Sequence, residues 1–362
     1  MTGVGWNVST HRLRGFQLPA LVFGLIVIGT LNPGEAFEQT AVPRQLGKLE
    51  VLSGPLPCEG GECYEIRVSC PEVEAPARAR LKAGAPAGTS GTSPKGTILF
   101  TSGGAGTDWY NSPSILSDVA AAGFRTVQLQ WIDSWLLGSA GKEEGHVRLG
   151  CRPATVARWV YDHFYEQRPT AAFCATGHSG GAAQVGYLLS HYGLKEILAA
   201  VVPSGGPPMA RMDRSCTRDD PANTSLAFPD WATRPIDAGF GFFPPVEPQT
   251  FNPFQAPAVG PCARGDASFR EKFRQASVAS SDGDYTYPRT MVWFVFEGID
   301  DTHAVAMGMT YYDLLIKMGS PLIRKTVVPD VNHAGPSGLY ASANGVRTVR
   351  DILLGECRPR TQ

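Results

Sequence analysis

The sequence predicts an α/β fold, a mostly parallel central sheet with helices on both faces. The first observation is a rhythm: from about residue 96 to residue 354, short apolar runs typical of strands alternate with stretches in which apolar residues recur at helical spacing. Such alternation produces parallel strands, because each helix crosses a face of the sheet before the next strand begins. The second is size, since 362 residues that are 43% hydrophobic can bury a large core within one elaborated domain.

The individual elements follow from local patterns. Residues 64–68 alternate apolar and polar side chains as a half-buried strand does, and residues 84–95 are rich in Pro, Gly, Ser and Thr, which predicts a hairpin loop. The expected strands are 64–68, 77–81, 96–100, 124–129, 171–176, 199–202, 291–298 and 323–329, and the expected helices are 114–122, 152–165, 182–189, 304–318 and 338–354.

The first residues are expected to direct export rather than to fold. An apolar run over residues 16–31 follows a basic stretch and precedes small residues that end at Ala36, which predicts a signal peptide of residues 1–36. An uncleaved membrane anchor is the alternative, but the run is short and carries Pro19. No later segment is long and apolar enough to cross a bilayer, so the mature chain is expected to be secreted, periplasmic or extracellular without a stable membrane span.

Eight cysteines fit an oxidising compartment, where disulfides persist. Cys216 and Cys262 flank one irregular segment and are predicted to pair, whereas Cys174 lies in an expected strand and is a candidate for a buried free thiol. Three further cysteines cluster near the mature N-terminus, for which a zinc site is a minor alternative. The formal net charge of -1 and the absence of a dense Lys/Arg run argue against nucleic acid as a partner.

A serine stands in a distinctive turn. Residues 177–181 read Gly-His-Ser-Gly-Gly between the expected strand at 171–176 and a helical pattern. A tight strand-to-helix turn lifts the Ser179 hydroxyl clear of the sheet, and it needs small neighbours because the strained backbone leaves no room for Cβ atoms. A glycine-rich turn also serves structural ends or binds phosphate, so the rest of the chain decides between these roles.

With this turn, residues 96–354 resemble the α/β-hydrolase fold superfamily, and the resemblance implies a Ser-Asp-His triad. Ser179 matches the nucleophile of that family. Asp301 fits the Gly-x-x-Asp spacing after the expected strand at 291–298, with Asp300 as the alternative if the turn is shifted by one residue. His333, in the loop after the last expected strand, is the implied base.

The same resemblance implies an oxyanion hole and a substrate pocket. The amide of Gly180 and an amide from the glycine-rich loop 101–106 are the expected donors, with Gly104 chosen and Ala105 as the alternative. The loop departs from the family's common His-Gly, having Ser102 and Gly103 there. The candidate pocket-lining residues are Trp109, Tyr110, His178 and Trp131, although aromatic residues at strand ends also serve plain packing.

Residues 204–288 interrupt the strand-helix rhythm and are rich in Pro, Gly and aromatic residues. In the family, a cap over the active site is inserted at this position, although an insert that only packs on the core is the alternative. The expected organisation is therefore a lead-in at 37–57, a hydrolase core at 58–203 and 289–356, and a cap at 204–288.

The resulting hypothesis is an exported serine hydrolase that cleaves small-molecule or lipid-like carboxylic esters through an acyl-enzyme intermediate, with no metal or organic cofactor. A peptidase or a lipase on the same fold is the alternative, because a fold does not fix a substrate. A binding protein without activity is a third class, against which the presence of all three triad residues argues.

Overall fold

The structure, a computed structural model, describes residues 41–87, 93–139, 142–165, 168, 170–216, 261–262, 266–299 and 304–360. They belong to one compact unit of residues 40–362. The predicted signal peptide, residues 217–260 of the predicted cap and both candidate acids, Asp300 and Asp301, lie outside the described residues.

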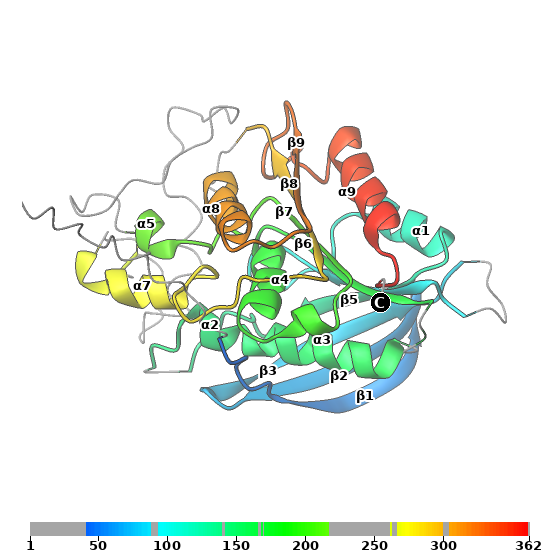
Figure 1. The fold of residues 1–362 in the computed structure, drawn as a ribbon. Coiled ribbons are helices and arrows are strands. Elements are labelled where there is room, and N and C mark those ends of the chain that lie inside the picture. The colour runs from blue at the N-terminus through cyan, green and yellow to red at the C-terminus, as the bar shows by residue number, and fades with distance from the viewer. Residues whose placement is uncertain are drawn as a thin grey trace, which may run out of the picture. The chain divides into compact units, whose positions relative to one another are not determined.

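Nine strands of the described chain form one sheet in the order β1-β2-β3-β5-β4-β6-β7-β8-β9. The pairs β1/β2, β2/β3 and β3/β5 are antiparallel, and every other pair is parallel. Figure 1 shows the antiparallel strands at one end of the sheet and β8 and β9 at the other. The strands are β1 (Lys48–Cys58), β2 (Gly61–Cys70), β3 (Val73–Gly84), β4 (Gly96–Thr101), β5 (Arg125–Trp131), β6 (Ala172–His178), β7 (Ala200–Ser204), β8 (Met291–Glu297) and β9 (Ile323–Val328).

Helices cover both faces of this sheet (Figure 1), as predicted. The buried residues of α1 and α9 join one core cluster, and those of α3, α4 and α8 join a second core on the opposite face. The helices are α1 (Pro113–Ala121), α2 (Gly145–Leu149), α3 (Cys151–Phe164), α4 (Gly180–Ser190), α5 (Met212–Cys216), α7 (Arg270–Ala276), α8 (Ala304–Lys317) and α9 (Ala343–Glu356), with short 3-10 turns at Leu194–Glu196 and Ala267–Phe269. In the part of the chain described, no helix has the length and apolarity to span a membrane.

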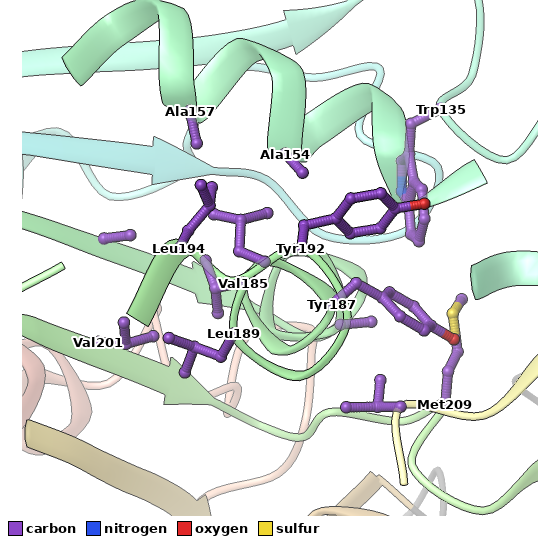
Figure 2. Close-up of a cluster of buried hydrophobic side chains, with 14 of the residues drawn as sticks. Trp135, Ala154, Ala157, Val185, Tyr187, Leu189, Tyr192, Leu194, Val201 and Met209 are labelled. Carbon is purple, nitrogen blue, oxygen red and sulfur yellow. The ribbon is translucent and has the colours of Figure 1, made fainter. Parts of the chain in front are cut away.

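The burial of each strand explains its sequence pattern. Every residue of β4, β6 and β7 is buried, since these strands lie mid-sheet between the two helical layers. In β2, by contrast, Tyr64, Ile66 and Val68 are buried against α3 while the residues between them face outward. Figure 2 shows the core between α3 and α4, where Ala154 and Ala157 leave room for the larger side chains of α4.

Three expected elements differ from the structure. The segment 84–95, predicted as a hairpin loop, does not join paired strands, because β3 and β4 on its two sides each pair with β5 and not with each other. The predicted lead-in at 37–57 contains β1, which was missed because this edge strand buries no residue and its register is broken between Val51 and Leu56. The last helix begins at Ala343 rather than at residue 338. Ser342 caps its start, because the Ser342 hydroxyl accepts a hydrogen bond from the Gly345 amide at 3.0 Å. Residues 338–342 stay in the preceding loop, in which Leu339 donates to the Asn332 carbonyl.

Four disulfides account for all eight cysteines. The predicted Cys216–Cys262 bond is confirmed, and closing a loop of that size stabilises a fold by roughly 4 kcal/mol. The suggestion that Cys174 is a free thiol is wrong, because Cys174 in β6 bonds to Cys357 just after α9. The N-terminal cysteines form Cys58–Cys63, within the β1–β2 hairpin, and Cys70–Cys151, which joins β2 to α3.

Candidate active site

Ser179 lies on a strained turn between β6 and α4. Its backbone has φ 55° and ψ -118°, a left-handed value that a residue with a side chain rarely adopts. The turn is packed closely against the glycine-rich loop after β4, since a Cβ on Gly180 would lie 2.8 Å from the nitrogen of Gly104. The small residues of the elbow are therefore needed for the close approach of two backbones, as the sequence predicts.

The predicted serine and histidine meet at the carboxyl edge of the sheet. The Oγ of Ser179 lies 2.8 Å from the Nε2 of His333, which extends from the loop after β9. The Nδ1 of the same imidazole lies 2.5 Å from the Oε1 of Glu297, the last residue of β8. All three side chains are buried. The arrangement supplies a hydroxyl, a base that can take its proton and a carboxylate that orients the base.

A carboxylate that the sequence analysis did not single out lies beside the imidazole. Asp301 and the alternative Asp300 lie outside the described residues, and the described structure has Glu297 at this position. The pairing of β8 with β9 sets Glu297 opposite Val328, so the carboxylate ends beside the loop that carries His333. A signal was present in the sequence: Glu297 is a single acidic residue that closes an otherwise apolar strand. A buried carboxylate at such a position needs a partner.

Two amides stand close to Ser179 where an oxyanion hole is expected. Gly180 is the first residue of α4, so its N–H has no acceptor within the helix. Gly104 has φ 56°, and no described residue accepts a hydrogen bond from its N–H. At the alternative position, no described residue accepts a hydrogen bond from the N–H of Ala105 either, so the alternative stays open. The geometry is thus compatible with the predicted pair, Gly104 and Gly180.

No protein-family model and no curated protein sequence matches this chain. Among solved structures, an acylaminoacyl peptidase from Pyrococcus horikoshii aligns with a TM-score of 0.47 at 10% identity, over 83% of this chain and 42% of its own. A lipase in an open form aligns with a TM-score of 0.46 at 15% identity, over 82% and 98%. A thermophilic esterase from Thermogutta terrifontis, bound to butyrate, aligns with 0.46 at 12% identity, over 76% and 89%. The chain therefore spans less than half the length of the peptidase.

The fold is assigned from the chain's own features. Its sheet order crosses from β3 to β5, back to β4 and on to β6, and the elbow serine follows the strand β6 between two helical layers. This is the α/β-hydrolase fold. In this fold, as in other open α/β sheets, binding sites lie beyond the carboxyl ends of the parallel strands, where Ser179, His333 and Glu297 are found.

A cavity of about 530 Å³ opens onto Ser179 and His333. Of the predicted lining residues, Trp109 and His178 border it. Tyr110 and Trp131 do not: each is buried, with the Tyr110 hydroxyl bonded to Tyr340 at 2.7 Å and the Trp131 indole donating to Gln184 at 3.1 Å. The remaining wall is mostly small or polar, formed by Ser102, Gly103, Gly104, Ala105, Thr107, Asp108, Asn111, Ala334, Gly335, Gly338, Tyr340 and Ala341.

His178 is a second imidazole within the site. Its ring lies between His333, at a centroid distance of 4.7 Å, and Tyr340, at 4.8 Å. Burial lowers the pKa of His178 well below its ordinary value, and the neighbouring His333 lowers it further. His178 is therefore neutral near pH 7, and it packs on the base without adding a charge beside it.

Proposed function

We propose that this protein is a serine hydrolase that cleaves carboxylic esters through an acyl-enzyme intermediate. One observation carries the proposal: the Ser179 hydroxyl, on a positive-φ turn that borders a cavity, lies 2.8 Å from an imidazole whose other nitrogen lies 2.5 Å from the buried carboxylate of Glu297. A hydroxyl, a base and an orienting acid in this order are what nucleophilic acyl transfer requires.

In the proposed reaction, His333 takes the proton of Ser179 as Oγ attacks the ester carbonyl. The negative oxygen of the tetrahedral intermediate receives hydrogen bonds from the amides of Gly104 and Gly180. The imidazolium then returns its proton to the departing alcohol, which leaves an ester on Ser179. Water, deprotonated by His333, adds to this ester, and collapse of the second intermediate releases the carboxylic acid and restores Ser179. Glu297 keeps the proton on Nδ1 and stabilises the imidazolium.

Esters are proposed over amides because the leaving group of an ester needs less protonation before it departs. An alkoxide departs far more readily than an amide anion, so ester cleavage depends less on proton transfer from His333 to the leaving group than amide cleavage does. Trp109 is the one large apolar side chain on the described wall of the cavity, apart from the ring of Tyr340. The polar and small remainder supports a compact ester, while a lipase or peptidase specificity stays the alternative.

Export and a cap complete the proposal. Disulfides persist in oxidising compartments, so the four bonds support the predicted signal peptide of residues 1–36 and a secreted or periplasmic protein. The insert between β7 and β8 contains the Cys216–Cys262 bond, and within this segment α5 packs against α7. We infer that this segment acts as a cap over the substrate.

The test is covalent labelling followed by substrate profiling. A fluorophosphonate probe is expected to modify Ser179, identified by peptide mapping, and Ser179→Ala is expected to remove the label. Turnover of p-nitrophenyl esters of increasing chain length is then compared with turnover of aminoacyl anilides. Hydrolysis of short esters supports the proposal, and turnover of anilides alone makes the protein a peptidase. If the protein folds but is neither labelled nor active, it is a binding protein.

A further inference from the structure

A chain of buried hydroxyl groups joins the segments that form the candidate site. Tyr110 donates to the hydroxyl of Tyr340 at 2.7 Å, and the Tyr340 hydroxyl lies 2.7 Å from Ser204. Ser204 donates to the carbonyl of Gly177 at 3.1 Å, so its proton is in use and Tyr340 is the donor to Ser204. All three hydroxyl-bearing residues are buried.

These residues come from four different elements. Tyr110 follows the glycine-rich loop after β4, Tyr340 belongs to the loop that carries His333, Ser204 ends β7, and Gly177 lies in the elbow strand β6. Tyr340 is the link at which the first two loops meet. Its ring also lies against His178, which in turn lies against His333. One side chain therefore contacts, directly or through one ring, the oxyanion loop, the Ser179 elbow and the His333 loop, and Glu297 on β8 is joined to them through His333.

We propose that Tyr340 is a positioning residue that holds the His333 loop and the oxyanion loop in register with the Ser179 elbow. The proposal rests on the function proposed above. The ring of Tyr340 fills space that a phenylalanine would fill as well, so its packing does not require the hydroxyl. The hydroxyl instead bonds the two loops to each other, since among the described residues no backbone hydrogen bond joins residues 101–112 to residues 329–342. An acyl-transfer site needs such fixing, because a displacement of about 1 Å can cost two orders of magnitude in rate.

A second pair of tyrosines provides a matched control. The hydroxyls of Tyr287 and Tyr311 lie 2.8 Å apart, both rings are buried, and Tyr287 also donates to the Asp284 carbonyl. Neither residue borders the cavity at Ser179. Tyr311→Phe thus removes one buried hydroxyl–hydroxyl bond, where Tyr340→Phe removes two, without touching the candidate site.

The experiment compares Tyr340→Phe with Tyr311→Phe. Tyr340→Phe is expected to lower kcat about tenfold, to change KM by less than about twofold, and to slow fluorophosphonate labelling of Ser179 in parallel. Tyr311→Phe is expected to keep kcat while losing similar thermal stability. Tyr110→Phe should lower kcat too, and the double variant Tyr110→Phe/Tyr340→Phe should lose less than the product of the two single losses, because both act on one bonded chain. Wild-type kcat in Tyr340→Phe overturns the proposal.

A readout that does not need turnover separates this proposal from the proposed function. The proton between His333 Nδ1 and Glu297 should give a far-downfield NMR resonance, given the 2.5 Å separation. In Tyr340→Phe this resonance should broaden and exchange faster with water, while in Tyr311→Phe it should not change. An unchanged resonance in Tyr340→Phe overturns the positioning role. A wild-type protein without activity or labelling overturns the hydrolase proposal, and the resonance still decides whether Tyr340 positions His333.

Discussion

Two clusters of serine, histidine and acid stand out among the described residues, and they differ in whether their surroundings are those of an active site. In the first, His333 lies between Ser179 and Glu297. In the second, which we call the buried cluster, the Nδ1 of His191 lies 2.7 Å from Ser190 and its Nε2 lies 2.8 Å from Ser280. Asp282 is 3.6 Å from the same Nε2 and also binds Arg44. Distances alone do not distinguish the two.

What differs is the use of the serine protons. Ser190 donates to the Gly186 carbonyl of its own helix at 2.9 Å, and Ser280 donates to Asp282 at 2.5 Å. Each hydroxyl thus has an acceptor within the fold besides the imidazole. Ser179, in contrast, stands on a positive-φ turn, borders the cavity of about 530 Å³ and lies beside the amides of Gly104 and Gly180.

The comparison teaches that a hydrogen-bonded serine and histidine do not by themselves make a nucleophile. The buried cluster fixes the end of α4 to the segment at 280–284 and, through Asp282, to Arg44 near the start of the described chain. In the first cluster, the strained backbone of Ser179 holds its hydroxyl at the wall of the cavity, and such strain is typical of functional sites. Activity should therefore depend on the first cluster and stability on the second.

The largest effect is expected from removing the serine of the first cluster. Ser179→Ala should lower kcat by about a million-fold, because it deletes the attacking oxygen while removing little volume. Ser190→Ala and Ser280→Ala should leave kcat near the wild-type value and lower only the melting temperature. Turnover of p-nitrophenyl acetate and fluorophosphonate labelling measure this difference. If Ser280→Ala removed the label and Ser179→Ala did not, the assignment of the two clusters would be reversed.

The acid of each cluster gives the next largest contrast. Glu297→Gln should lower kcat by about four orders of magnitude, since an amide cannot accept the Nδ1 proton and so favours the wrong tautomer of His333. Asp282→Asn should leave kcat almost unchanged. Steady-state kinetics of these variants, with Asp301→Asn and Asp300→Asn beside them, decide which carboxylate serves the imidazole. A greater loss in Asp301→Asn than in Glu297→Gln would support the prediction made from the Gly-x-x-Asp spacing.

The acid illustrates why local patterns predict one part of this site and not another. Ser179 and its glycines form one continuous turn, so their pattern is complete within five residues. The partner of His333 depends instead on the register between β8 and β9, which places Glu297 opposite Val328. That pairing is set by contacts between distant segments. The Gly-x-x-Asp spacing starts at Gly298 and points to Asp301, so it does not consider Glu297, the residue before Gly298.

The aromatic residues and the first strand show the same limit. Tyr110 follows β4 and Trp131 ends β5, at the edge where a pocket was expected, but each side chain is buried and bonded to a partner, Tyr340 or Gln184. Only the tertiary structure decides the direction of such a side chain. β1 was missed because an edge strand with no buried residue has no apolar alternation to detect. The parallel strands and most helices could be predicted because the apolar runs and helical spacing of their own residues reflect their burial.

A smaller effect is expected from crowding the imidazoles of the first cluster. Gly205 has φ 55°, and a Cβ there would lie 2.7 Å from His178 Nε2 and 3.1 Å from His333 Cε1. Gly205→Ala should therefore displace both rings and lower kcat by about a hundredfold. Gly319→Ala is the matched control, because Gly319 also has a positive φ, 77°, but its Cβ would meet no atom within 4 Å. Equal kcat in the two variants, at equal melting temperature, would show that backbone strain and not the imidazoles explains any loss.

The smallest effect on activity, and a distinct effect on stability, is expected from His191 in the buried cluster. Burial lowers the pKa of His191 below its usual value of about 6.5, although hydrogen bonding to Asp282 opposes this. Between that value and the lower folded-state pKa, the unfolded chain binds a proton that the folded chain does not. The contribution of neutral His191 is therefore complete above about pH 6.5 and is lost as the pH falls, so the folded state loses stability on acidification.

His191→Gln should keep kcat and should lower the free energy of unfolding by about 1 to 3 kcal/mol near pH 7. It should also reduce the decline of that free energy toward about pH 5. Urea unfolding at the two pH values measures this, with the exposed His163→Gln as control. The decline should be reduced and not abolished, because burial also lowers the pKa of His146, to about 3, and that of His178. A decline as steep in His191→Gln as in the wild type would mean that the buried cluster does not contribute to the acid sensitivity of the fold.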